Sequence, residues 1–418
     1  MFTDLRNRPY IRMRTGDKNL STGIFTLQNG NWVEKGFIAD IKTKYPGFTR
    51  TRQASGWHST KTAFDAENHL YTCLAIQCAD KSYHRLLLYS RNGGDSYQVY
   101  ELPLGRGVHD IEHWTGHNVC PGPPPVILYS FTGSHPARFC SFHDLFLLFP
   151  RKTEAGLDLG EPILVTRNCF GTCQHSGKPA PTVTLGDRTH IVWGEIDDSG
   201  VPGVPTYAAT YLHREKRMTR KVLLGYGPPV NDVHNAPGIC ADSRGYLHVM
   251  TGAHGAPFYY LRSRKPNDAL SGWTDPVPVC KTGYVDDKSG PEGRGRQTYL
   301  SLQFDSHDTL HTAFRQWRRN VDPYFGGQIY AALSYQRKPR GRPWEKARPL
   351  IVPPLPRYSI YYHNLTHDRR DSLYLSYSYY SVDEAYRNDI PGQYDYRAVI
   401  TSPDGGTTWK LLETADFE

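Results

Sequence analysis

The chain has 418 residues, of which 49 are Lys or Arg and 41 are Asp or Glu, so its formal charge is +8. Its hydrophobic content of 38% excludes a disordered chain, and no apolar run approaches the roughly 20 residues that a membrane-spanning helix needs. No apolar segment of a signal peptide follows Met1. The positive charge fits nucleic acid or an anionic polysaccharide as partner, but the basic residues are scattered, which argues against nucleic acid.

Short apolar strands, each preceded by a turn, recur along the chain. We mark them by Leu70, Ile127, His190, Leu247, Leu310 and Leu373. The intervals between successive markers are 57, 63, 57, 63 and 63 residues. Acidic turns such as Asp242–Gly245 and Asp305–Asp308 precede some of them, as in hairpins. The 29 Tyr, 38 Gly and 31 Pro also favour short strands and tight turns, and sustained helical periodicity is absent, so we expect few helices.

A second repeated motif supports the same period. Ser402–Trp409 fits the Asp-box turn of bacterial neuraminidase repeats, and Ser90–Tyr97 is a looser copy. A period near 60 divides the chain about seven times, so we expect an all-β fold in which residues 1–418 form a single seven-bladed β-propeller domain. The ring would be closed by N- and C-terminal strands, with Ile24–Gln28 completing the blade of the C-terminal hairpin. An eight-bladed ring or a sandwich is the alternative architecture.

Polar residues recur just before each expected inner strand. They are His58, His117, His175, His234, Tyr299 and His363. Inner strands line the channel of a propeller and start at one common face, so the spacing predicts five imidazoles and a phenol around one mouth. The alternative for each His is a hydrogen bond to neighbouring backbone.

One corner of this mouth is expected to gather His, Tyr and Arg side chains. His254 follows His234 by 20 residues, and a two-strand hairpin of that length returns the chain to the same end. The next blade supplies Tyr299 and Arg315. β-Elimination from a uronic acid, the reaction of a uronate lyase, needs a base for the C5 proton and an acid for the departing O4. It also needs positive charge beside the carboxylate. His, Tyr and Arg supply these functions, and the sequence leaves open which of His234 and Tyr299 is the base.

With these residues and repeats, the chain resembles the seven-bladed propeller polysaccharide lyases with neuraminidase-type repeats, which include ulvan lyases and rhamnosyl-glucuronate lyases. The resemblance implies a carbon–oxygen lyase that cleaves a uronic-acid glycan of ulvan or rhamnose-capped arabinogalactan type at rhamnose-α-1,4-glucuronate bonds. His234 and Tyr299 would transfer protons, and His254 and Arg315 would neutralise the carboxylate. The resemblance also implies a secreted or periplasmic protein, and we expect a monomer that binds an anionic polysaccharide or oligosaccharide, with neither nucleic acid nor membrane as a partner.

Further residues are weaker candidates for substrate contacts. They are Asn235, Lys178, Arg318, Tyr361 and His175, and aromatic contacts are expected within Tyr358–Tyr362.

Two other functions remain as alternatives. One, which the resemblance also implies, is an α-L-rhamnosidase-type glycoside hydrolase on the same scaffold, in which a His on the opposite face, such as His58 or His69, would act. The carboxylate pair of most glycosidases is not evident, since the nearest acidic cluster, Glu195 with Asp197–Asp198, is expected to be a solvated loop. The other alternative is a non-catalytic glycan-binding propeller.

We expect no cofactor to be required for the chemistry. A structural divalent ion is expected at most, and its ligands stay unknown from the sequence. Zinc would suit the repeated His or the segment Cys169–His175, whereas calcium would suit strand-end carbonyls and carboxylates. The eight cysteines are too few for a dense disulfide framework in a chain of this length, and nucleotide or flavin motifs are absent.

Overall fold

The computed structural model describes most of the chain. The described residues are 1–13, 23–52, 61–136, 140–172, 177, 179–197, 203–228, 231–280, 296–319, 329–352, 360–379 and 396–417. Within them the regular structure is nearly all strand, and its helices are α1 (Ile38–Lys44) and the 3₁₀ turns η1 (Val233–Asn235) and η3 (Thr414–Phe417). The prediction of an all-β chain with few helices is therefore confirmed for this part. None of these helices is long and apolar enough to cross a membrane.

The described strands form seven antiparallel sheets of four or five strands and one two-stranded ribbon. The first sheet holds β1 (Phe2–Thr3), β2 (Pro9–Met13), β3 (Gly23–Gln28) and β4 (Asn31–Lys35); the second holds β5 (Phe48–Arg52), β6 (Thr62–Phe64), β7 (Leu70–Cys78), β8 (Tyr83–Ser90) and β9 (Gln98–Glu101). The third holds β10 (Gly107–Ile111), β11 (Val126–Ser134), β12 (Ser141–Leu148) and β15 (Ile163–Cys169), and the ribbon is β13 (Arg151–Lys152) with β14 (Leu157–Asp158).

The other four sheets follow in chain order. The fourth holds β16 (Thr182–Leu185), β17 (Arg188–Gly194), β18 (Pro205–Leu212), β19 (Arg217–Met218) and β20 (Val222–Tyr226); the fifth holds β21 (Gly238–Ala241), β22 (Leu247–Met250), β24 (Tyr259–Lys265), β25 (Asp268–Trp273) and β26 (Val277–Pro278). The sixth holds β23 (His254–Ala256), β27 (Arg296–Phe304), β28 (Leu310–Arg319), β29 (Ile329–Lys338) and β30 (Arg348–Ile351); the seventh holds β31 (Ile360–His367), β32 (Leu373–Tyr379), β33 (Tyr396–Ser402) and β34 (Lys410–Leu411).

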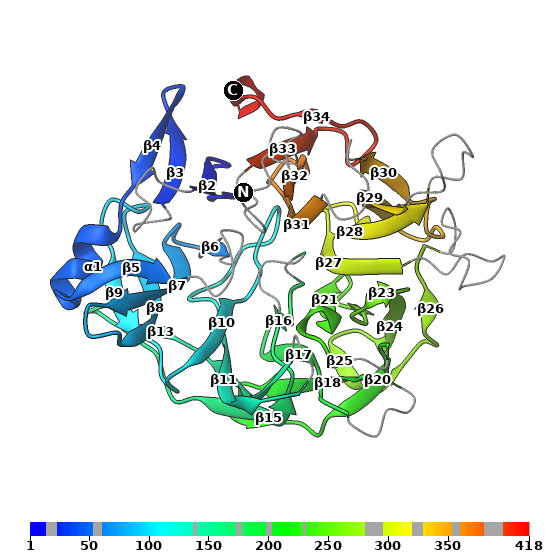
Figure 1. Cartoon of the computed structure of the whole chain (residues 1–418), viewed down its shortest axis with the longest axis horizontal. Coiled ribbons are helices and arrows are strands. Elements are labelled where there is room, and N and C mark those ends of the chain that lie inside the picture. The colour runs from blue at the N-terminus through cyan, green and yellow to red at the C-terminus, as the bar shows by residue number, and fades with distance from the viewer. Residues whose placement is uncertain are drawn as a thin grey trace.

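The sheets follow one another around a common centre, from blue through green to red (Figure 1). Strands β6, β10, β16, β21, β27 and β31 lie nearest that centre. All six marker residues lie in the strand after an inner one, namely β7, β11, β17, β22, β28 and β32. The predicted repeat is therefore a real structural period, set in six of the seven sheets by the strand that follows the inner one.

Facing sheets bury apolar side chains against each other. Tyr71 and Leu87 of the second sheet pack in one cluster with Leu128 of the third. Val192 of the fourth sheet likewise packs with Val249 of the fifth. These interfaces hold the sheets at fixed positions around the centre, where the polar residues of the inner strands meet.

The turns that lead from β1 or from an inner strand to the next strand form a second connection between sheets. In five of them an Asp accepts backbone N–H bonds from residues two and four places later; these are Asp4, Asp65, Asp242, Asp305 and Asp368. Three places after four of these Asp residues, the side chain of Asn7, Asn68, Asp308 or Asp371 accepts a backbone N–H from the turn of the preceding sheet. These four residues have φ of 62°, 64°, 59° and 64°, a left-handed conformation that Asn and Asp tolerate best.

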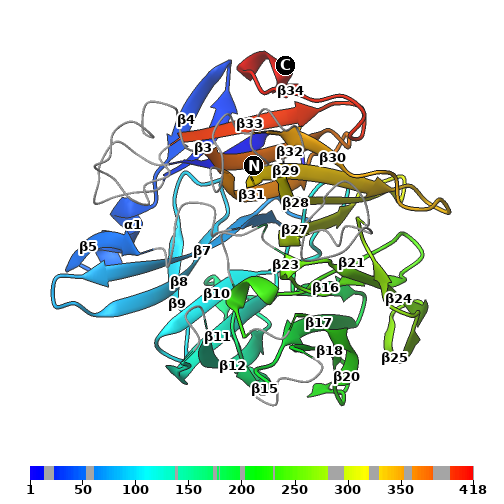
Figure 2. The ribbon, with the colours of Figure 1, turned by 45° about the vertical axis from the view of Figure 1, so that its right-hand side comes forward.

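The same turns join the first sheet to the last. Asn7 Oδ1 accepts a bond from Arg369 N at 2.8 Å, and Asn7 Nδ2 donates to Asp368 Oδ2 at 3.1 Å. Trp32 in β4 packs edge-on against Phe417 in η3, and the two sheets lie side by side in Figure 2 as well as in Figure 1. Contact between turns thus brings the two ends of the chain together.

The expected mixed sheet of N- and C-terminal strands is absent from the described residues. Ile24–Gln28 belongs to β3 in the first sheet, and Ser402–Trp409 connects β33 to β34 in the last. Each terminal segment is long enough to supply four strands of its own, so neither borrows a strand from the other. The prediction of closure by a shared sheet is corrected to contact between two complete sheets.

Asn7→Ala should therefore lower the free energy of unfolding by about 2 kcal/mol. The change removes both hydrogen bonds between the first and last sheets and leaves a residue that disfavours positive φ. Asn29→Ala is the matched control, because Asn29 has φ of 49° in an exposed turn of one sheet. Chemical denaturation compares the two variants, and an equal loss in both would show that the bonds between sheets contribute nothing.

Candidate functional site

Asp232 lies at the centre of a polar cluster where β21 begins. It caps η1 by accepting the backbone N–H of His234 at 2.8 Å, and it is buried, with 4% of its surface exposed. Its Oδ1 also accepts from Nδ1 of His234, and its Oδ2 accepts from Nδ1 of His254 at 2.6 Å. The two imidazole rings lie 4.7 Å apart. One carboxylate therefore fixes both histidines, and the two rings lie together, as their 20-residue spacing predicts.

The pKa values define the protons in this cluster. Burial favours a neutral Asp232, but the hydrogen bonds and charges of the two histidines outweigh it and hold the pKa of this carboxyl well below its usual range. An ionised carboxylate only accepts, so each Nδ1 carries a proton. Burial lowers the pKa of His234 despite the opposing effect of Asp232. His234 is therefore mainly neutral at pH 7, with an unprotonated Nε2.

Tyr299 approaches His234 from β27 in the next sheet. Its ring centroid is 5.2 Å from that of His234, and its φ of 68° falls in the left-handed region, which is strained for an aromatic residue. The register of β27 against β28 shifts between Thr298 and Ser301, so Tyr299 lies in a bulge. Gly177 packs on this bulge, where an added Cβ would lie 2.3 Å from Leu300 O. The phenol ring thus extends from a strained backbone position and lies beside the ring of His234.

Arg315 in β28 supplies positive charge beside the same ring. Its Cζ lies 4.1 Å from the ring centroid of Tyr299, a cation–π contact, and 1% of its surface is exposed. His254, by contrast, exposes 31% of its side chain, whereas His234 exposes 10%. The structure thus brings the four predicted residues together, with His254 accessible and Arg315 behind the ring of Tyr299.

The weaker predictions are only partly described. Asn235 is buried in η1 next to His234. Arg318 and Tyr361 lie in β28 and β31, where they pair with Tyr330 and Ser378, and their side chains lie outside the described part. His58, His175, Lys178 and the segment 353–359 also lie outside it.

Two histidines of the predicted ring have other environments. His363 in β31 is buried and donates from Nε2 to Ala313 O at 3.0 Å, the alternative expected for such residues. The prediction that His117 lies at the same mouth as His234 is wrong. His117 lies in the loop after β10 and contacts His367, the last residue of β31. It therefore lies at the opposite end of the inner strands from His234. The sequence pattern placed His117 before the inner strand of its sheet. In the structure it follows the inner strand β10 and precedes the second strand β11.

The residues considered for hydrolysis or metal binding contact other parts of the fold. Glu195 accepts bonds from Trp193 Nε1 at 3.0 Å and Lys221 Nζ at 2.6 Å in its own sheet, and from Thr166 Oγ1 at 2.6 Å in β15 of the preceding sheet. His69 is 3.0 Å from the hydroxyl of Tyr89. The described cysteines are all free thiols, and Cys173 lies outside them. Burial raises the pKa of Cys169 to about 12, so its thiol is protonated.

The sequence reasoning missed Asp232. A local signal existed, since Asp two residues before His234 fits an N-cap of a short helical turn. Its bond to His254 is a contact across 22 residues, which the local pattern does not reveal.

Residues 202–416 match the BNR repeat-containing family, and no curated protein matches. Among solved structures, a sialidase from Trypanosoma rangeli is 10% identical, with 90% of this chain and 58% of that chain covered and a TM-score of 0.44. A polysaccharide lyase family 25 ulvan lyase bound to a glucuronate–sulfated rhamnose ligand is 8% identical, with coverage of 84% and 81% and a TM-score of 0.47.

A third similar structure is a family 93 α-L-arabinofuranosidase from Fusarium graminearum. It is 10% identical, with 89% of this chain and 93% of that chain covered and a TM-score of 0.44. This chain spans just under three fifths of the length of the sialidase.

Proposed function

The chain belongs to the BNR repeat-containing family, and from that premise and the geometry around Asp232 we propose that it is a carbon–oxygen lyase that cleaves uronic-acid glycans by β-elimination. We infer that its seven sheets are the blades of one propeller. The proposed substrate is an anionic polysaccharide or oligosaccharide with rhamnose-α-1,4-glucuronate bonds, and the proposed form is a secreted or periplasmic monomer.

One observation carries this proposal: the Asp232 carboxylate holds two imidazoles by Nδ1, beside a phenol ring that lies in contact with a buried guanidinium. This set contains a base, an acid and positive charge within one cluster. A hydrolase that uses paired carboxylates would need two such groups about the scissile bond, and Asp232, bound to both histidines, is not free for that role.

His234 acts as the base in the proposed reaction. Its neutral Nε2 removes the C5 proton of the uronate, and the electron pair forms the C4–C5 double bond. The C4–O4 bond breaks as this double bond forms, and the hydroxyl of Tyr299 donates its proton to O4. Transfer of the proton from His234 to the Tyr299 phenolate, directly or through water, then restores the site.

Positive charge stabilises the intermediate, whose uronate carboxylate becomes electron-rich when C5 loses its proton. His254 is placed for this role, because 31% of its side chain is exposed and its Nδ1 is held by Asp232. Arg315 contributes from behind Tyr299, where its charge also stabilises a phenolate.

The test uses a glucuronate-containing polysaccharide and the same polymer with its carboxyl groups reduced to alcohols. We expect ultraviolet absorbance of an unsaturated uronate to rise with the native polymer alone, because the reduced polymer has a far less acidic C5 proton and no carboxylate to neutralise. Reducing sugar without this absorbance would contradict elimination and indicate hydrolysis. Binding of all tested uronate glycans without turnover would contradict an enzymatic function.

A further inference from the structure

A second group of ligand-type side chains lies at the other end of the inner strands. The Asp232 cluster lies where β21 starts, whereas this end is marked by His367, the last residue of β31. A cavity of about 550 Å³ opens here. Residues that follow β10, β16 and β21 line it, together with the last residues of β27 and β31. It is therefore a central cavity, separate from the proposed lyase site.

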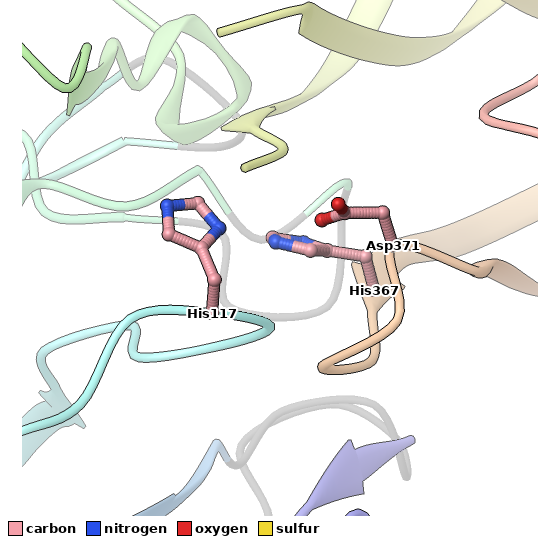
Figure 3. A group of neighbouring side chains, drawn as sticks. All are labelled: His117, His367 and Asp371. Atoms are coloured by element: carbon pink, nitrogen blue, oxygen red, sulfur yellow. The ribbon is translucent and has the colours of Figure 1, made fainter. Parts of the chain in front are cut away.

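Three side chains converge beside this cavity (Figure 3). His117 comes from the loop after β10, His367 from the end of β31, and Asp371 from the turn between β31 and β32. One nitrogen of each histidine and one oxygen of Asp371 all lie within 4.8 Å of one another. Figure 3 shows the rings and the carboxylate directed toward a common region.

Two buried nitrogen atoms at this position have no partner within the part of the chain that the structure describes. They are Nε2 of His367, a residue that is 1% exposed, and Nδ1 of His117. Gly116 leaves the space that this Nε2 needs, because an added Cβ would lie 1.8 Å from the nitrogen. An unpartnered buried nitrogen is unfavourable unless a ligand binds it.

The Asp232 group differs on this point. Its histidines both donate to the carboxylate, so hydrogen bonds explain why the three side chains meet. The ring centroids of His117 and His367 are 5.9 Å apart, and among the described residues neither Nδ1 of His117 nor Nε2 of His367 has a hydrogen-bond partner. Only the second group therefore lacks an explanation within the described residues.

The surroundings orient and attract a cation. Asp371 accepts bonds from the backbone N–H and the hydroxyl of Ser306, which fix the carboxylate and leave lone pairs for a further bond. Asp305 and Asp308 add negative charge that acts on His117 together with Asp371. Thr115 Oγ1, 3.4 Å from Nδ1 of His367, lies on the far side of that ring from Nε2.

We propose that His117, His367 and Asp371 bind a Zn²⁺ ion beside the central cavity. Two imidazoles and one carboxylate are ligands that zinc prefers, whereas calcium prefers oxygen ligands alone. Ligand atoms of a tetrahedral zinc lie about 3.3 Å apart, so side-chain rotation must bring the present atoms closer by at most about 1.5 Å. Three protein ligands leave a fourth position for water or a ligand oxygen.

The test measures zinc itself. The protein is stripped with a chelator, loaded with ZnCl₂, freed of excess by gel filtration and analysed for metal, and its affinity is measured by competition with a chromophoric chelator. We expect one zinc per chain. His117→Ala should remove it, and Asp371→Asn should weaken binding at least about tenfold. The turn should survive this Asn, because Asn7 and Asn68 occupy the corresponding position in other turns.

Two controls locate the ion. His307→Ala should bind zinc like the native protein, because His307 is 80% exposed and approaches Asp371 without belonging to the group. His254→Ala should also retain one zinc. Failure of the native protein to retain zinc would overturn the proposal, as would unchanged affinity in His117→Ala or loss of zinc in His254→Ala. Thermal unfolding of each variant without zinc verifies that the fold is intact.

Discussion

Tyr299→Phe is expected to reduce the rate of unsaturated-uronate formation about 10³-fold, with little change in KM. Phenylalanine keeps the ring beside His234 and over the guanidinium of Arg315, so packing and substrate binding should persist. The change removes only the hydroxyl that donates a proton to O4. Initial rates from ultraviolet absorbance at several substrate concentrations separate kcat from KM.

The matched control is Tyr260→Phe in β24. The hydroxyl of Tyr260 is buried and lies 2.6 Å from Nδ1 of His248, so its loss also removes a buried hydrogen bond. We expect this variant to be less stable but equally active. If Tyr299→Phe stays within about tenfold of the native rate, or if both variants lose activity equally, the acid role of Tyr299 is wrong.

The strained backbone of Tyr299 is consistent with a functional role for its side chain. A bulky residue at a φ of 68° costs on the order of 1–3 kcal/mol. The bulge in β27 and the contact of Gly177 with Leu300 hold it there. Strain of this kind persists where the surrounding structure imposes it, and here it directs a phenol at an imidazole.

The strands were predictable because their signals are local. An Asp that caps its own turn is followed within a few residues by an apolar strand, as at Asp242 and Leu247 or at Asp305 and Leu310. The contact between the first and last sheets was not predictable in this way. It depends on Asn7 reaching Arg369 across almost the whole chain, and the sequence near either residue does not identify its partner.

The site was predictable in its residue types but not in its connections. The 20-residue spacing from His234 to His254 indicated that they meet, and they do. Their common partner Asp232 and the burial of Arg315 depend on how adjacent sheets pack. The prediction for His117 was wrong because the sequence pattern took the second strand of its sheet, β11, for the inner strand β10. A spacing of about 60 residues does not distinguish the loop before the inner strand from the loop after it.

Asp232→Asn is expected to lower kcat about 10³-fold and to move the acid limb of the pH–rate profile to lower pH. The carboxylate raises the pKa of His234 against the larger lowering effect of burial. Its removal therefore lowers that pKa further, so the imidazole loses its proton at a lower pH. Above this pH the variant is still slower than the native protein. An amide can donate to Nδ1 and so favour the tautomer with a protonated Nε2, which cannot act as a base.

Asp242→Asn separates this positioning role from a purely structural one. Asp242 is also buried, lies at the other end of β21, and binds backbone N–H groups and His248, so its change should reduce stability alone. We expect its pH–rate profile to match that of the native protein. An Asp232→Asn profile with an unmoved acid limb would refute the link to His234, because loss of folded protein lowers the rate equally at every pH at which the remaining fold is stable.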